Sequence, residues 1–303
     1  MSVSRFNITP DGPDCSRFAA GFWRLHDWKL SVSERLALIE RYLDLGITTT
    51  DHADIYGGYS CEQLFGEALA QKPEWRDQME IITKCGINLL DEKYPDRHVK
   101  HYDTSKTHIL EAVDNSLSNL NCGYLDILLI HRPDPLMQAD EVAEAFEILR
   151  TNGKVKHFGV SNFTPAQFSL LQSRLDYSLV TNQIELSPLA LASMNDGSLD
   201  QCQQQRISPM IWSCLGGGKL FSDTSERSIQ LRQILRDIAE ETGAQSIEQV
   251  VYAWVLQLPS KPMPIIGSGN AERIKLAAES ESIQLERQQW FRILESAVGR
   301  RVA

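Results

Sequence analysis

The sequence lacks paired cysteines, a long hydrophobic run and an excess of positive charge. Its six cysteines include no CxxC pair, so free thiols in a reducing cytoplasm are expected rather than disulfides or a zinc site. The apolar runs, such as the one near Ile127 to Ile130, are too short to cross a bilayer, and the first residues show no secretory signal. The net charge of -10 argues against non-specific binding to nucleic acid or an anionic membrane, although it leaves room for a local basic pocket. These absences predict a cytoplasmic protein with neither nucleic acid nor membrane as a partner.

Strand and helix patterns alternate along all 303 residues. Apolar and β-branched runs predict strands centred on Ala20, Thr49, Ile82, Leu128, Gly159, Gln183, Met210 and Ile265. Amphipathic patterns predict helices at 33–45, 60–70, 105–120, 140–150, 164–171, 199–205 and 228–242, with extra helices at 246–256 and 286–297. No linker interrupts the alternation, so we predict one domain over residues 1–303, an α/β fold with a single (β/α)8 TIM barrel and extra helices near the C-terminus. A doubly wound sheet is the alternative, and Pro262 and Pro264 at the start of the last strand suit a barrel interior poorly.

Local signals mark helix ends and loops. A Ser or Thr followed three residues later by Gln predicts capping boxes at Ser60, Thr164 and Ser246, and Gly46 and Gly243 lie where C-caps are expected. Longer loops follow residues 87, 131 and 215. In a barrel all three loops would lie on the catalytic face and form the walls of a substrate pocket.

Four strand patterns end abruptly in polar residues. They are Asp51 to Tyr56 (sequence DHADIY), Lys84 in Ile-Thr-Lys, His131 in Leu-Ile-His, and Ser161-Asn162 in Gly-Val-Ser-Asn. A buried strand of a parallel sheet delivers such a side chain at its carboxyl end. An acid, a phenol, an ammonium and an imidazole brought together in this way could form one proton-transfer site.

Tyr56 is the candidate proton donor because a phenol has a pKa of about 10 and is protonated at neutral pH. A nearby Lys84 ammonium would lower that pKa, Asp51 could hold the lysine in place by a salt bridge, and His131 could orient a substrate oxygen. Each residue also has an ordinary interpretation, as a structural ion pair or a buried core histidine. Their joint occurrence, in order on successive strand patterns, favours a site.

The same residues resemble the motifs of the aldo-keto reductase superfamily. Asp51 to Gly57 is similar to D-T-A-x-x-Y-G, Lys84 lies in T-K, His131 lies in L-I-H, and residues 153–163 are similar to G-K-I-R-x-x-G-V-S-N-F. The resemblance runs from Gly21-Phe22-Trp23 to Arg273. It implies an NAD(P)H-dependent carbonyl reductase on a (β/α)8 barrel, with Tyr56 as proton donor, Lys84 and Asp51 as its tuning pair, and His131 as the orienting group.

The resemblance also implies a cofactor, NADPH (NADP+), lying across the mouth of the barrel. Ser161, Asn162 and Gln183 match positions that hydrogen-bond the nicotinamide carboxamide, although a Ser-Asn turn would explain the first two. Trp212 replaces the tyrosine that stacks on the nicotinamide, and a core tryptophan is the ordinary alternative. The remaining positions expected to contact the cofactor are Gly21, Phe22, Trp23, Ser213, Leu215, Gly216, Gly218, Gly267, Ser268, Gly269, Asn270 and Arg273.

Two glycine-rich segments bear on phosphate binding. Gly216 to Leu220 is not a P-loop because its lysine is followed by leucine rather than Ser or Thr. Gly267 to Glu272 is not a dinucleotide fingerprint, but its place between a strand and a helix suits phosphate binding. Arg273 has the family spacing for meeting the 2′-phosphate, which would favour NADPH over NADH, while an exposed helix arginine is the default.

Departures from the family pattern place the chain in a divergent bacterial branch. Leu276-Ala277 replaces a Glu-Asn pair that holds the adenine in many relatives, Gly267 replaces a lysine, and residues 212–215 read Trp-Ser-Cys-Leu instead of Tyr-Ser-Pro-Leu. The leading hypothesis is reduction of a small-molecule aldehyde or ketone by NADPH. A non-catalytic redox-sensor subunit that holds NADPH, and a metal-dependent hydrolase using His52, Asp54 and His131, are the alternatives. The sequence leaves the physiological substrate and the oligomeric state open.

Overall fold

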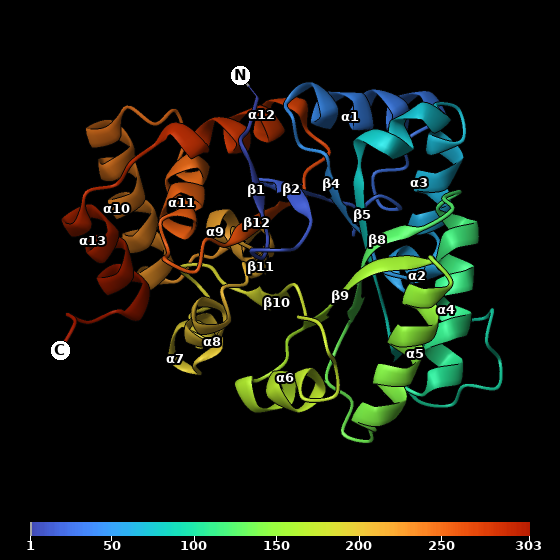
Figure 1. Ribbon diagram of the computed structural model, residues 1–303. Coiled ribbons are helices and arrows are strands. Elements are labelled where there is room, and N and C mark those ends of the chain that lie inside the picture. The colour runs from blue at the N-terminus through green and yellow to red at the C-terminus, as the bar shows by residue number, and fades with distance from the viewer. Residues whose placement is uncertain (1) are drawn as a thin grey trace.

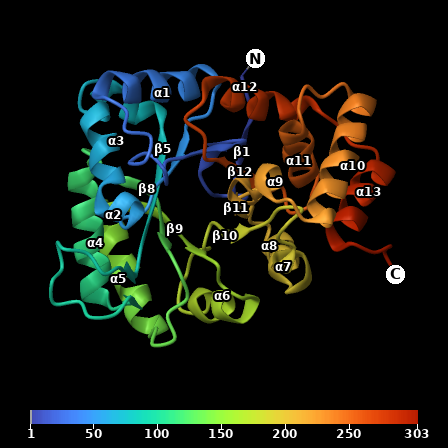
Figure 2. The same cartoon turned by 180° about the vertical axis from the view of Figure 1, so that it is seen from behind.

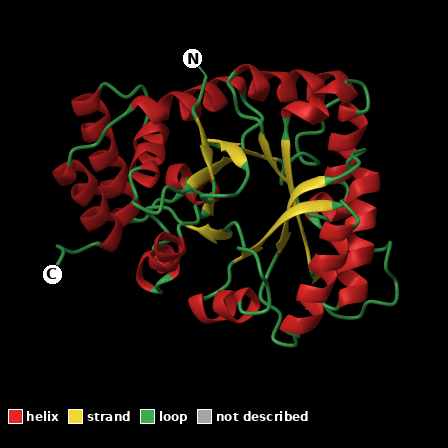
Figure 3. Cartoon of the chain, in the orientation of Figure 1, coloured by secondary structure: helices red, strands yellow, loops and turns green. Residues whose placement is uncertain are grey.

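The computed structural model describes residues 2–303 and contains a closed barrel of eight parallel strands with helices around it (Figures 1 and 3). The strands follow one another around the barrel in chain order, and the last pairs with the first through Ile265 and Ala19. This closure confirms the predicted (β/α)8 barrel and excludes the doubly wound alternative. The eight strands, each at a predicted centre, are β3 (Ala19–Gly21), β4 (Thr49–Asp51), β5 (Glu80–Cys85), β8 (Leu125–Ile130), β9 (Val155–Ser161), β10 (Asn182–Glu185), β11 (Met210–Trp212) and β12 (Met263–Ile266).

The helices form the outer layer, and those whose range was predicted from the sequence begin and end within about two residues of it. The longer ones are α1 (Val32–Asp44), α3 (Cys61–Leu69), α4 (Lys106–Asn119), α5 (Ala139–Thr151), α6 (Pro165–Gln172), α8 (Ser198–Gln205), α10 (Glu226–Thr242), α11 (Ile247–Leu256), α12 (Ala271–Glu279) and α13 (Arg287–Val298). Short helices are α2 (Tyr56–Tyr59), α7 (Ala192–Asn195) and α9 (Lys219–Ser222), with 3₁₀ turns at Pro73–Gln78, Gly216–Gly218 and Ser280–Ser282. The predicted extra helices α11 and α13 pack with α10 on one side of the barrel, as the two opposite views show (Figures 1 and 2). No helix within residues 2–303 is long and apolar enough to cross a membrane.

Two short antiparallel hairpins were not predicted. One joins β1 (Arg5–Asn7) to β2 (Asp14–Ser16), and the other joins β6 (Ile87–Asn88) to β7 (His101–Tyr102) within the long loop after β5. The first hairpin precedes β3, and Ile8 and Cys15 belong to the same buried cluster as the side chains inside the barrel. It therefore covers the amino ends of the strands, and the opposite end remains for a site.

The barrel strands are buried on both faces, and their alternation decides which side chains reach the mouth. On β8, Ile127 and Leu129 belong to the inner cluster, so the next inward position is His131. On β5 the same alternation leads from Ile82 to Lys84. The apolar runs read in the sequence thus continue directly into polar side chains at the carboxyl end of the barrel.

Pro264 lies within β12 and is tolerated for a local reason. The N–H of Met263 bonds the carbonyl of Pro209 on the β11 side, so the next residue would donate toward β3. Because β3 begins at Ala19, opposite Ile265, no ladder acceptor lies beside the missing N–H of Pro264. The proline therefore occupies a position of the strand where its lost donor is not needed.

Of the three predicted capping boxes, only the one at Thr164 forms. Thr164 and Gln167 form the predicted capping box, and Gly243 ends α10 in the left-handed region at φ 74°. Ser246 caps α11, but the capping box predicted there is wrong, because the Gln249 side chain accepts from the backbone N–H of Gln245 instead of that of Ser246. The capping box predicted at Ser60 is wrong, because the Ser60 hydroxyl donates to the carbonyl of Gly57 instead of capping α3.

Candidate active site

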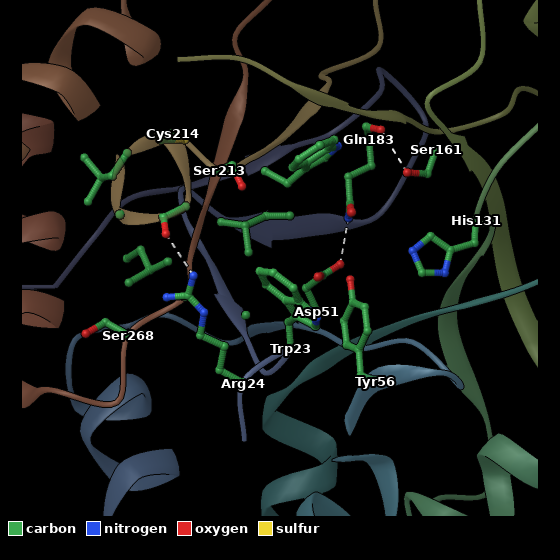
Figure 4. Close-up of a pocket in the computed structure, with 18 of the residues that line it drawn as sticks. Trp23, Arg24, Asp51, Tyr56, His131, Ser161, Gln183, Ser213, Cys214 and Ser268 are labelled. Atoms are coloured by element: carbon green, nitrogen blue, oxygen red, sulfur yellow. Dashed lines mark hydrogen bonds between the residues drawn. The ribbon is translucent and has the colours of Figure 1, made fainter. Parts of the chain in front are cut away.

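A cavity of about 620 Å³ opens at the carboxyl ends of the strands (Figure 4). Tyr56, Asp51 and His131 line one part of it, and Gly267, Ser268 and Arg273 line another. The three long loops predicted as substrate walls all contribute residues to it. From these loops come Leu89 and Lys100, Arg132, and Gly217, Gly218 and Phe221.

Lys84 is fully buried at the end of β5 and holds three oxygen partners. Its Nζ lies 2.8 Å from Oδ1 of Asp51, 3.0 Å from the phenol oxygen of Tyr56 and 2.6 Å from the carbonyl oxygen of His52. Burial acts to lower the pKa of Lys84, but Asp51 and then Tyr56 outweigh it, so that this pKa is raised. Lys84 is therefore a permanent ammonium, and the expected salt bridge to Asp51 is present.

The pKa of Tyr56 differs from the expectation. Burial raises the pKa of the Tyr56 phenol, and although the Lys84 ammonium lowers it, burial has the larger effect. The prediction that the lysine brings this pKa below its ordinary value is thus wrong for the free protein. Because burial disfavours the charged phenolate, Tyr56 carries its proton at neutral pH.

His131 stands across from Tyr56, with ring centroids 5.8 Å apart and ring planes at 79° (Figure 4). Burial lowers the pKa of His131 well below its ordinary value, and the cations Lys84, Arg132 and Lys100 lower it further. The imidazole is therefore neutral at pH 7, and one of its nitrogens carries a hydrogen to donate. A carbonyl oxygen placed between the two rings would have a phenol and an imidazole as hydrogen-bond partners.

The predicted nicotinamide-binding residues form one hydrogen-bonded chain. Trp212 Nε1 donates to Asn162 Oδ1 at 3.1 Å, and Asn162 Nδ2 donates to Ser161 Oγ at 2.7 Å. Ser161 Oγ donates to the backbone carbonyl of Gln183, and Gln183 Nε2 donates to Asp51 Oδ1 at 2.7 Å (Figure 4). The chain connects the tryptophan at the end of β11 to the carboxylate that pairs with Lys84.

The other part of the cavity is built from backbone. Ser213 and Gly216–Gly218 all have positive φ, and a Cβ added at Gly217, Gly218 or Gly267 would meet no atom within 4 Å. Gly217, Gly218 and Gly267 all line the cavity, so their backbones are open to it. Asn270 caps α12 by accepting from the backbone N–H of Arg273 at 3.1 Å, and the start of that helix supplies free N–H groups to an anion.

These groups match the chemistry of a nicotinamide dinucleotide. An indole, a hydroxyl and amides lie beside the proton donor, an open glycine backbone suits a pyrophosphate, and a guanidinium lies beyond it. Arg24 spans the cavity, since its Nη2 donates to the carbonyl of Gly217 at 3.0 Å. The residues that could hold such a cofactor are Gly21, Trp23, Ser161, Asn162, Gln183, Trp212, Ser213, Leu215, Gly218, Gly267, Ser268 and Arg273, all of which line the cavity.

Four predicted cofactor residues lie outside the lining of the cavity. The ring of Phe22 is buried and stacks on His52 with centroids 5.1 Å apart, and a Cβ on Gly269 would lie 3.0 Å from Trp28. Gly216 and Asn270 flank the cavity through the 3₁₀ turn and the α12 cap. Cofactor contact by these four residues stays a prediction.

Several lining residues were missed by the sequence analysis. Arg24 directly follows the Gly21-Phe22-Trp23 motif, and Glu248 and Tyr252 lie within the predicted helix 246–256, but none of the three had been given a role in the site. Arg132 and Lys100 could have been predicted to line the cavity, because each lies in a loop already predicted to border the substrate pocket. His52 and Asp54 do not line the cavity, and within residues 2–303 no group of three or more His, Cys, Asp and Glu side chains is placed to hold a metal ion.

Comparisons with known proteins agree with this geometry. The model of the Aldo/keto reductase family matches residues 17–297. The chain is 57% identical over 297 residues to the oxidoreductase YdhF of Escherichia coli K12, covering 98% of each protein. It is 44% identical to a 6-dehydroglucose reductase of Agrobacterium fabrum, over 97% of this chain and 98% of the relative. In fold it is similar to the thermostable aldo-keto reductase Tm1743, crystallised with the inhibitor epalrestat, with a TM-score of 0.82, 23% identity, and coverage of 97% of this chain and 100% of that one. The chain therefore belongs to the aldo/keto reductase family and is an oxidoreductase that reduces carbonyl groups.

Proposed function

We propose that this protein uses NADPH to reduce an aldehyde or ketone to the alcohol, with Tyr56 as the proton donor. The observation that carries the proposal is the 3.0 Å contact between Lys84 Nζ and the Tyr56 oxygen, in a cavity wall that also presents His131. NADPH, when bound, supplies the hydride that adds to the carbonyl carbon. The carbonyl oxygen then takes its proton from Tyr56, the products are the alcohol and NADP+, and the phenolate that is left regains a proton from solvent before the next turnover.

The protein residues have separate roles in this proposal. The neutral imidazole of His131 donates a hydrogen bond that orients the carbonyl oxygen, so that the phenol meets the same oxygen. Lys84 and Asp51 act as positioning residues, because the buried lysine touches Tyr56 but does not line the cavity. The high pKa of Tyr56 is compatible with donation, since an alkoxide forming on the substrate is far more basic than a phenolate.

The residues beside the reacting groups would fix the cofactor. Ser161, Asn162 and Gln183 would bind the carboxamide, and Trp212 would stack on the ring. Arg273 supports NADPH over NADH, because it lines the cavity and is in no ion pair within residues 2–303. Leu276 also lines this part of the cavity and can offer the adenine only apolar contact.

The relatives suggest where to begin with substrates. Two of them, 44% and 37% identical, are named 6-dehydroglucose reductase. That sugar carries an aldehyde, which is the functional group that the proposed chemistry reduces. A 6-oxo sugar is accordingly the first candidate substrate.

The test is to follow NADPH absorbance in the presence of 6-dehydroglucose and a panel of aldehydes, ketones and quinones, with NADH in parallel. The proposal expects turnover of at least one class, faster with NADPH than with NADH. Tight retention of NADPH with no turnover on the whole panel would refute it and favour a redox-sensor subunit.

A further inference from the structure

The substrate part of the cavity holds two cations that the reaction does not use. Arg132 directly follows His131 in the loop after β8, and Lys100 lies in the loop just before β7. Both line the cavity, Arg132 half-buried and Lys100 exposed. Within residues 2–303, neither side chain has a salt bridge to a carboxylate or a hydrogen bond to another residue.

The other charged groups that line the cavity either have partners or belong to other elements of the fold. Asp51 is paired with Lys84, and Arg24 donates to Gly217 while lying over the ring of Trp23. Glu248 belongs to α11, which packs against α12, the helix that carries Arg273. In the described part of the chain, no carboxylate that lines the cavity forms a salt bridge with Arg132 or Lys100.

Both cations are placed to act on a substrate held at His131. The Arg132 guanidinium lies 5.6 Å from the centroid of the Trp212 ring, at the edge of the predicted nicotinamide position. Both residues also count among the charges that lower the pKa of His131, so their fields reach the imidazole. A guanidinium braced on an aromatic ring keeps its N–H groups free for a planar anion.

These two cations are separate from the groups suited to the phosphates of the cofactor. The open backbone at Gly217, Gly218 and Gly267 and the side chain of Arg273 already supply that function. The whole chain has a net charge of -10. Two cations that have no carboxylate partner among residues 2–303 and lie beside the reacting groups are therefore unexpected in so acidic a protein. Their presence there points to an anionic group on the molecule that is reduced.

We infer that Arg132 and Lys100 form an anion-binding subsite that selects carbonyl substrates carrying a carboxylate or phosphate group a few bonds from the carbonyl. This inference rests on the proposed function and narrows its substrate class to anionic carbonyl compounds, so an anionic aldehyde replaces the neutral 6-oxo sugar as the expected preferred substrate. Arg132 would take two oxygens of the anion in a fork, and Lys100 would approach the same group as a point charge. The anion thereby fixes the distance of the carbonyl from Tyr56 and His131.

The kinetic test compares substrates that differ only in the anion. Succinic semialdehyde is paired with butanal, 4-carboxybenzaldehyde with 4-methylbenzaldehyde, and glyceraldehyde 3-phosphate with glyceraldehyde, all with NADPH. We expect kcat/KM to be about tenfold or more higher for the anionic member of at least one pair. The first two pairs test a carboxylate and the third tests a phosphate.

Variants assign the preference to the residues. Arg132→Gln and Lys100→Gln should each remove most of the preference through a higher KM, with little change in kcat for the neutral substrates or in NADPH affinity. Arg132→Lys should restore part of it. Lys72→Gln is the matched control, because Lys72 is an exposed lysine after α3, outside the cavity. Equal losses on the neutral and anionic members would overturn the subsite, as would a wild-type preference for neutral aldehydes, 6-dehydroglucose included.

A binding measurement separates this inference from the proposed function. Glutarate, which cannot be reduced, is titrated calorimetrically into the protein with NADP+ present. The subsite predicts binding that weakens about tenfold in Arg132→Gln but is unchanged in Lys72→Gln. If glutarate binds in this way but no substrate is turned over, the proposed function is wrong and the subsite stands. If neutral substrates are turned over but glutarate does not bind, only the subsite is wrong.

Discussion

Tyr56 and Lys84 meet through a 3.0 Å contact between the phenol oxygen and Nζ, yet only the tyrosine lines the cavity. The lysine is fully buried, so it does not touch a reacting molecule and acts on it through its neighbours, above all the phenol. This arrangement separates the group that transfers a proton from the charge that assists it.

Replacing Tyr56 with phenylalanine tests that separation. Tyr56→Phe keeps the ring that packs edge-on to His131 and removes only the hydroxyl. We expect turnover to fall about 10²- to 10⁴-fold, the usual contribution of a general acid, with NADPH affinity unchanged. Steady-state kinetics and a fluorescence titration of NADPH measure the two quantities. A variant that keeps most of its turnover would show that Tyr56 is not the acid.

Arg273→Gln tests the choice of cofactor. The guanidinium is expected to bind the 2′-phosphate that NADPH has and NADH lacks, and a charge-assisted contact of this kind contributes about 1.5–3 kcal/mol. Affinity for NADPH should therefore fall about tenfold to a hundredfold, while affinity for NADH stays nearly constant. Titrations of both cofactors into wild type and variant give the answer. Equal losses for the two would mean that Arg273 does not distinguish them.

The barrel was predictable because each of its strands is visible in the local sequence as an apolar run. The apolar runs at Ile82 and Leu128 end in Lys84 and His131, and side-chain alternation sends those polar groups inward at the carboxyl end. Closure of the sheet then brings residues far apart in sequence together, as in the bond between Gln183 and Asp51. The alternation of strands and helices was therefore enough to predict that Asp51, Tyr56, Lys84 and His131 lie at the same end of the barrel.

Other features depend on packing that the sequence does not express. The hairpin of β1 and β2 pairs only three residues on each side, too few to give a pattern. The capping box at Ser60 fails because Gly57 and Gly58 both adopt positive φ, and the turn that they form redirects the Ser60 hydroxyl. The raised pKa of Tyr56 comes from burial, which is known only once the cavity walls are in place.

Gly66→Ala tests the contact between two neighbouring helices. A Cβ at Gly66 in α3 would lie 2.0 Å from the carbonyl oxygen of Asn119 at the end of α4. Because the opposing atom is backbone, the helices must move apart, and we expect a loss of about 1–3 kcal/mol in the free energy of unfolding. Gly123→Ala is the control, since nothing lies within 4 Å of its Cβ position. Urea unfolding of both variants measures the difference, and equal stability of the two would contradict the predicted clash.

His52→Phe tests how a buried imidazole that the proposed reaction does not use changes the pH dependence of stability. The imidazole packs between Phe22 and Phe65, with centroids 5.1 Å and 4.4 Å away, and neither of its nitrogens has a partner within residues 2–303. Burial, with a smaller effect from Lys84, lowers the pKa of His52 to about 3. The unfolded chain takes up this proton below about pH 6.5, whereas the folded chain does not until near pH 3. Between these values the unfolded state binds more protons, so the histidine makes stability fall as the pH falls.

The size of that effect follows from the two pKa values. Relative to pH 8, the wild-type imidazole should cost about 2 kcal/mol of unfolding free energy at pH 5, and a phenylalanine in the same place cannot cost anything through protonation. Between pH 8 and pH 5, the free energy of unfolding of His52→Phe should therefore fall by about 2 kcal/mol less than that of wild type. This difference does not depend on how the larger ring changes stability at pH 8. Urea unfolding of both proteins at the two pH values gives this double difference, in which any change of packing cancels. If both proteins lose the same stability on acidification, His52 accepts its proton in the folded state, and its burial between the two phenylalanines does not keep it neutral.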